Sequence, residues 1–184
     1  MKYFCLTSLL LLISSFQTAA QTSEKATSTV EPQAVSKENK KILVQLTPFG
    51  YLTLPKGYWA YMTTDFMDAW IGIVETLNGD FKISFSDGII VSVFKGEDKN
   101  IKWEKELKTE NYTIIYALAD DGKTKRILAK IESANFSTQI KDDSEIEKFL
   151  EIISNYRTGS CEQCFDSHYT KHLRKIFEKY NKID

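Results

Sequence analysis

The segment DAWIGIVETLNGDFKISFSDGIIVSVF, residues 68–94, decides the predicted fold of this chain. It contains three runs that are rich in β-branched and aromatic residues, and the dipeptides Asn78-Gly79 and Asp87-Gly88 separate them. These residue types tolerate a positive φ, which the tight turns of β-hairpins require. The segment therefore predicts a meander of three antiparallel strands.

The second run has the period of a half-buried strand. Between Phe81 and Ser86 every apolar residue is followed by a Lys or a Ser, so one face is expected to be buried and the other to meet solvent. Similar runs bounded by turn residues predict further strands at residues 42–46, 51–54, 58–62, 101–107, 112–118, 126–131 and 135–140.

The spacing of apolar residues becomes helical after Asp142. Acidic and N-capping residues at 142–145 come before an apolar stripe with spacing i, i+3, i+4 and i+7, formed by Ile146, Phe149, Leu150 and Ile153. A second amphipathic helix is predicted over Ser167–Tyr180. We therefore predict an α+β fold, with an antiparallel, meander-rich β-sheet packed by one or two C-terminal helices.

The N-terminal residues have the layout of a cleaved secretory signal. MKYFCLTSLLLLISSFQTAA combines Lys2, a short apolar run and a small-residue end, which predicts a mature start near Gln21. Secretion or transfer to the periplasm is expected, with no transmembrane segment after cleavage. The predicted organisation is a signal peptide at 1–20, a polar, disordered linker at 21–40, a globular domain at 41–157 and a Cys/His-containing helical tail at 158–184.

The charge balance argues against a nucleic-acid partner. The 184 residues carry a formal net charge of −1, with 24 basic and 25 acidic side chains and therefore no basic excess. A chain of this size is long enough to bury one self-sufficient core. The partner that we expect is therefore a protein or a small-molecule ligand.

The tail contains every Cys and His of the predicted mature chain. Cys161, Cys164, His168 and His172 follow the spacing C-x2-C-x3-H-x3-H, and these are the ligand types that zinc sites use. Zinc or another borderline metal would then join the Cys turn to the start of the last helix.

Two other interpretations of the cysteines remain open, and we favour the first. In an oxidising compartment Cys161 and Cys164 would form a disulfide, which stabilises so short a loop by roughly 2 kcal/mol. A redox-active dithiol is the other, although such motifs usually open a helix in a βαβ unit. A c-type haem is excluded, because Phe165 and not His follows the second Cys.

No familiar catalytic motif is present, so the protein is not expected to be an enzyme. Tyr58, Trp59 and Tyr61 follow a Pro-Lys-Gly turn, and they would mark a binding loop if their rings were exposed. The alternative is that these aromatic residues belong to the core. The predicted function is non-catalytic ligand or protein binding by an exported domain, with metal binding by the tail as the alternative and an enzyme of unrecognised site as a third.

Leu54-Pro55-Lys56-Gly57-Tyr58, followed by the hairpin at Gly79–Phe85, resembles a loose group of small exported bacterial proteins. Members of that group share an LPxGY-like opening and a β-hairpin core, and they have no established activity. The resemblance covers residues 46–156 and stops before the cysteines. It implies an exported single domain, and it transfers no catalytic residue to this chain.

Overall fold

The computed structural model describes residues 41–66, 69–88, 94, 96–97, 99–167, 174–175 and 177–179, which all belong to one compact unit, Glu31–Asp184. The predicted signal peptide and linker, the predicted third run of the meander and both histidines of the tail lie outside these residues, apart from Phe94. Among the described helical residues, no helix is long and apolar enough to cross a membrane.

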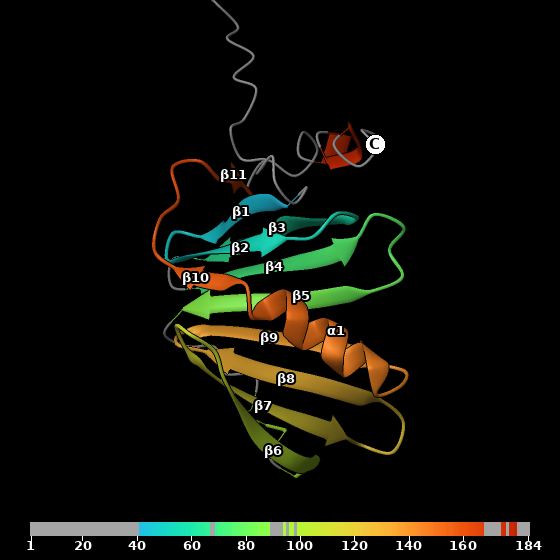
Figure 1. The fold of residues 1–184 in the computed structure, drawn as a ribbon. Helices are drawn as coiled ribbons and strands as arrows, with labels where there is room; N and C mark the ends of the chain where they lie inside the picture. The colour runs from blue at the N-terminus through green and yellow to red at the C-terminus, as the bar shows by residue number, and fades with distance from the viewer. Residues whose placement is uncertain are drawn as a thin grey trace, which may run out of the picture. The chain divides into compact units, whose positions relative to one another are not determined.

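The larger of two sheets has seven strands, and every neighbouring pair is antiparallel (Figure 1). Their order in space is β3 (Tyr58–Phe66), β4 (Ala69–Thr76), β5 (Lys82–Gly88), β9 (Ala134–Ile140), β8 (Lys125–Ile131), β7 (Thr113–Asp120) and β6 (Ile101–Lys108). Two meanders, β3-β4-β5 and β6-β7-β8-β9, therefore meet where β5 pairs with β9.

The smaller sheet has four strands and joins residues that are far apart in the chain. Its order is β10 (Tyr156–Thr158), β2 (Gly50–Leu54), β1 (Ile42–Thr47) and β11 (Phe165–Asp166), and only the β1–β11 pair is parallel. Ser167 ties β11 to both sheets, because its amide donates to Gln45 O at 3.1 Å and its carbonyl accepts from Met62 N at 3.1 Å.

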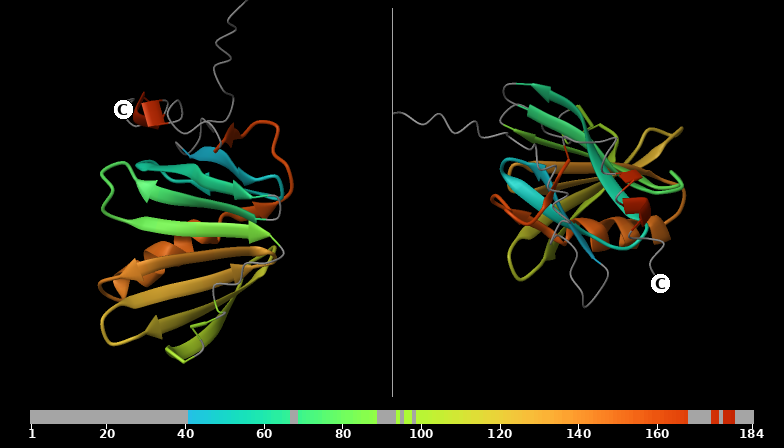
Figure 2. Two further views of the ribbon diagram at one scale, coloured as in Figure 1. Left: turned by 180° about the vertical axis from the view of Figure 1, so that it is seen from behind. Right: turned by 90° about the horizontal axis from the view of Figure 1, so that it is seen from above.

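One face of the seven-stranded sheet carries most of the core. The four-stranded sheet and helix α1 (Ser144–Ile153) lie on this face in both orientations of Figure 2. Alternation decides which side chains point there, so Ile83 and Phe85 of β5 are buried while Lys82 and Ser84 are exposed. α1 contributes its apolar stripe, of which Phe149, Ile152 and Ile153 are fully buried.

The predicted α+β class is wrong, because the protein is mainly β. Eleven strands and one ten-residue helix are assigned among the described residues, with a few further helical residues at 174–175 and 177–179. Three buried side chains of α1 cannot form a helical layer over seven strands. A second sheet takes that place, built partly from two strands, β10 and β11, that are only three and two residues long.

The Asn78-Gly79 turn of the predicted meander is confirmed, since it connects β4 to β5 and Gly79 has φ of 79°. The prediction of a turn at Asp87-Gly88 is wrong. Both residues continue β5, and Asp87 pairs with Trp70 on one side and Ala134 on the other. Its carboxylate is 1% exposed and accepts a hydrogen bond of 2.8 Å from Thr47 Oγ1, so a buried partner replaces the solvent that a turn would provide.

Candidate functional site

The junction of the two meanders opens at one end of the sheet. β5 and β9 are paired from Ser84–Ser137 to Asp87–Ala134, and their pairing stops at the first of these pairs. Beyond it, the Thr138 hydroxyl spans the gap and contacts Lys82 O at 2.5 Å and Gln139 O at 3.1 Å. A side chain therefore occupies the place of the next backbone hydrogen bonds, and β9 continues in register with β8 alone.

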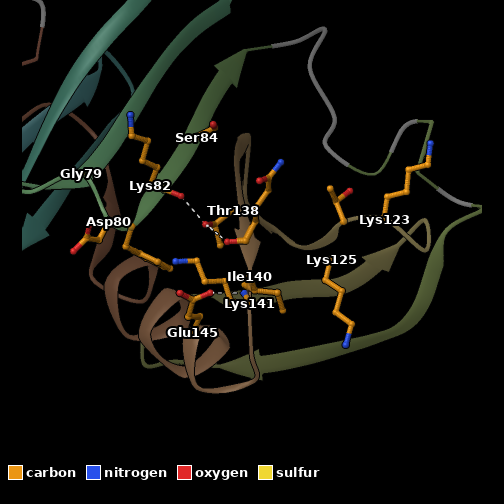
Figure 3. Close-up of a pocket in the computed structure, with 13 residues that line it drawn as sticks. Gly79, Asp80, Lys82, Ser84, Lys123, Lys125, Thr138, Ile140, Lys141 and Glu145 are labelled. Atoms are coloured by element: carbon orange, nitrogen blue, oxygen red, sulfur yellow. Dashed lines mark hydrogen bonds between the residues drawn. The ribbon is translucent and has the colours of Figure 1, made fainter.

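This opening forms a cleft of about 720 Å³, which we call the strand-gap cleft. α1 contributes Glu145, which accepts a hydrogen bond from the Lys141 amide at 2.6 Å. The residues that line the cleft come from β5, β8, β9, α1 and the connections between these elements: Gly79, Asp80, Phe81, Lys82, Ser84, Lys123, Thr124, Lys125, Thr138, Gln139, Ile140, Lys141 and Glu145 (Figure 3).

The cleft has a surplus of positive charge. Four exposed lysines line it, Lys82, Lys123, Lys125 and Lys141, against two carboxylates, so the surplus is two charges. In Figure 3 the side chains of Lys82, Lys123 and Lys125 extend away from one another. Such a spread does not surround a single small anion, and it suits negative charges that are distributed along a ligand.

Lys82 connects the cleft to a second polar group. Its ammonium lies 2.9 Å from Glu75 Oε2, and the Glu75 side chain is only 10% exposed. The hydrogen bond and the negative charge of Glu75 raise the pKa of Lys82. The pair lies on the sheet face opposite α1, because Lys82 alternates along β5 with the core residue Ile83. Glu75 and then Trp59 lie opposite Lys82 in register, on the same face.

Trp59 and Tyr61 stand side by side on that face. Their rings are stacked with centroids 4.4 Å apart and an interplanar angle of 27°. Trp59 is 7% exposed, and its indole Nε1 has no hydrogen-bond partner within the described part of the chain. The Arg174 guanidinium lies 5.5 Å from its ring. Tyr61 is half-buried, and burial together with the charge of Glu75 raises its pKa.

Tyr58, the third residue of the predicted aromatic loop, points the other way. It belongs to the core, and Lys148 of α1 lies 5.7 Å from its ring. The structure therefore brings Trp59 and Tyr61 together and separates them from Tyr58. All three lie in strand β3 and not in a loop.

The two cysteines of the tail form a disulfide, with Cα atoms 5.3 Å apart. Both sulfur atoms are engaged in that bond, so neither is a thiolate that could bind zinc. His168 and His172 lie outside the described residues, and within the described ranges no group of three or more His, Cys, Asp or Glu side chains is arranged to hold a metal ion. Gln45 anchors the turn, because its Oε1 accepts from the Cys161 amide at 2.7 Å.

A buried polar cluster joins the two sheets next to the core. The Tyr156 hydroxyl lies near Asp87, and burial together with the charge of that carboxylate raises the Tyr156 pKa strongly. The two groups are not in hydrogen-bonding geometry, and neither Tyr156 Oη nor Asp87 Oδ1 has a hydrogen-bond partner among the residues that the structure describes. Thr47 Oγ1 is the donor that Asp87 Oδ2 uses.

Sequence reasoning missed both the strand-gap cleft and the buried cluster. The four cleft lysines are separated by up to 59 positions, from Lys82 to Lys141, and show no local pattern. For the burial of Asp87, the only hint in the sequence was that an apolar run lies on either side of the Ser86–Gly88 segment. Comparisons with family models, with curated proteins and with solved structures found no match to this chain.

Proposed function

We propose that this protein is an exported, non-catalytic domain that binds an anionic ligand in the strand-gap cleft. The observation that carries the proposal is the gathering of four lysines from separate segments around one opening in the sheet. Exposed ammonium groups beside a concave surface raise the local concentration of anions and hold them by charge-assisted hydrogen bonds.

The lining between the lysines supports the same function. Ser84, Thr138 and Gln139 offer hydroxyl and amide groups that can fix the orientation of a bound ligand. Among the described residues, Lys123, Lys125 and Lys141 make no side-chain ion pair, so their charges are available to a ligand.

Export is part of the proposal. It is supported by the pattern of residues 1–20 and by the disulfide, because disulfides persist in oxidising compartments. The proposed resemblance to small exported proteins also supports export. The intact mass of the protein recovered from its compartment tests export: we expect a chain that begins near Gln21, and a mass that includes residues 1–20 would contradict it.

Anion binding is tested by titrating the mature chain with dextran sulfate and with neutral dextran of the same length, using isothermal calorimetry. We expect binding of dextran sulfate alone, weakening as ionic strength rises. Lys123→Ala/Lys125→Ala should weaken it about fivefold, since two exposed charge contacts of roughly 0.5 kcal/mol each are lost.

The control is Lys108→Ala/Lys130→Ala, which removes the same charge from exposed positions away from the cleft. It should change the dissociation constant less than about twofold. Equal weakening by both variants would mean that dextran sulfate responds to overall charge, and the proposed cleft would be wrong.

A further inference from the structure

The cleft continues into an exposed row of side chains on the face of the sheet opposite α1. The strand register places Tyr61 opposite Ile73, Ile73 opposite Ser84, and Ser84 opposite Ser137. All four residues are partly or fully exposed, and Ser84 also lines the cleft. Because neighbouring strands lie about 4.8 Å apart, this row across β3, β4, β5 and β9 is about 14 Å long.

From this row we propose that the ligand is an acidic polysaccharide, whose chain lies along Tyr61, Ile73, Ser84 and Ser137 and places its carboxylates among the cleft lysines. The inference rests on the proposed function, and it adds the chemical class of the ligand and the direction in which it lies. A sugar chain is extended, carries hydroxyls along its length and presents apolar C–H faces, and each of these features has a counterpart in the row and the cleft.

Tyr61 provides the platform for a C–H face. Its ring is held from behind by the stacked Trp59, and Glu75, the cross-strand neighbour of Trp59, lies beside it. A ring fixed in this way loses little conformational entropy on binding, which makes it an effective contact for a flat apolar surface. Ile73 extends the apolar surface by one strand toward Ser84.

The polar groups match sugar hydroxyls better than phosphates. Ser84, Ser137 and Gln139 supply donors and acceptors at the end of the row that lies farther from Tyr61. Two carboxylates also line the cleft, those of Asp80 and Glu145. They can accept hydrogen bonds from sugar hydroxyls, which are donors that ionised phosphate groups do not provide.

The lysine side chains extend away from one another, which suits a ligand chain that carries its charges at intervals. Lys82 lies beside the row, two residues before Ser84 on β5, and Lys123 and Lys125 lie farther from it, at the turn between β7 and β8 and at the start of β8. Since their side chains extend in different directions (Figure 3), each would meet a different carboxylate of an extended ligand.

The experiment compares four probes on the mature chain by calorimetry at one ionic strength: polygalacturonate, polyglutamate, single-stranded DNA and neutral dextran. We expect polygalacturonate to bind at least about fivefold more tightly than polyglutamate of equal charge, because the aromatic contact adds to the charge contacts. Tyr61→Ala should remove this preference and leave polyglutamate unchanged. Tyr61→Phe, which keeps the ring, should bind polygalacturonate like the unmodified protein and controls for folding.

The outcomes separate this inference from the proposed function. Equal binding of polygalacturonate and polyglutamate, unaffected by Tyr61→Ala, would overturn the polysaccharide and leave anion binding in place. Tighter binding of DNA would overturn it in favour of a nucleic acid, and tighter binding of polyglutamate in favour of an acidic peptide. Binding of none of the three polyanions would overturn both proposals.

Discussion

A methyl group at position 50 would collide with the phenol of Tyr156. An ideal Cβ built on Gly50 lies 1.9 Å from Tyr156 Oη and 2.3 Å from Cζ, and both distances are far below van der Waals contact. Gly50 is not among the residues with positive φ, so alanine strains no backbone dihedral there. The effect of Gly50→Ala is therefore steric, and it depends on whether Tyr156 can move.

Tyr156 has little room to move. It is 1% exposed, and its ring packs edge-on against Phe136 with centroids 5.5 Å apart. Overpacking a well-filled core costs typically 1–3 kcal/mol, and a Gly→Ala change returns roughly 0.4–1 kcal/mol by restricting the unfolded chain. We expect Gly50→Ala to lower the free energy of unfolding by about 2 kcal/mol.

A double-mutant cycle with Tyr156→Leu tests the cause. Leucine removes the hydroxyl and the outer ring atoms, so Gly50→Ala in that background should be neutral or stabilising by up to about 1 kcal/mol. The coupling energy between the two positions would then be about 2–3 kcal/mol, measured by urea unfolding followed by tryptophan fluorescence. The same cost of Gly50→Ala in both backgrounds would refute the steric explanation.

Three other predictions concern the buried cluster and the disulfide. Because the Tyr156 pKa is raised above its ordinary value of 10.0, the stability that its neutral form provides is complete below pH 10 and is lost as pH rises further. The urea midpoint should fall less between pH 8 and pH 11 in Tyr156→Phe than in the unmodified protein, and an identical fall would contradict this. Asp87→Ala leaves the buried Thr47 hydroxyl without its acceptor and should cost about 1–3 kcal/mol, whereas Asp80→Ala in the exposed turn should cost less than about 0.5 kcal/mol. Reduction of Cys161–Cys164 should lower the free energy of unfolding by no more than roughly 2 kcal/mol, because the loop that it closes is short. Cys161→Ala/Cys164→Ala should reproduce that loss and be insensitive to reductant, and a larger loss in either case would show that the turn supports more than its own loop.

Some structural features follow directly from short stretches of sequence. Alternation between Phe81 and Phe85 identified both the strand and its buried face, as β5 shows, whereas Ser86 was expected to meet solvent and is buried. The apolar stripe of Ile146, Phe149 and Ile153 identified α1 and its packing side in the same way. These predictions succeeded because the side-chain period of a strand or helix is a property of neighbouring residues alone.

Other predictions failed where the partner of a segment is distant. Asp87-Gly88 has the residues of a turn, yet Thr47, 40 positions away, provides Asp87 with a buried hydrogen-bond donor that stabilises it within a strand. β11 is too short to show any period, and it exists because Val44 of β1 pairs with Phe165. The fold class was wrong for the same reason, since these short strands build the second sheet.

The sequence by itself determined the positions of the long strands, the Asn78-Gly79 turn and α1, and the expected export favoured the disulfide that the structure contains. The tertiary structure alone decided that β5 meets β9, that their pairing stops at Ser84–Ser137 and that lysines from separate segments line the resulting cleft. Local periodicity is set by residues close in the chain, whereas a gap between two strands depends on how long each remains in register with a partner that lies some fifty residues away.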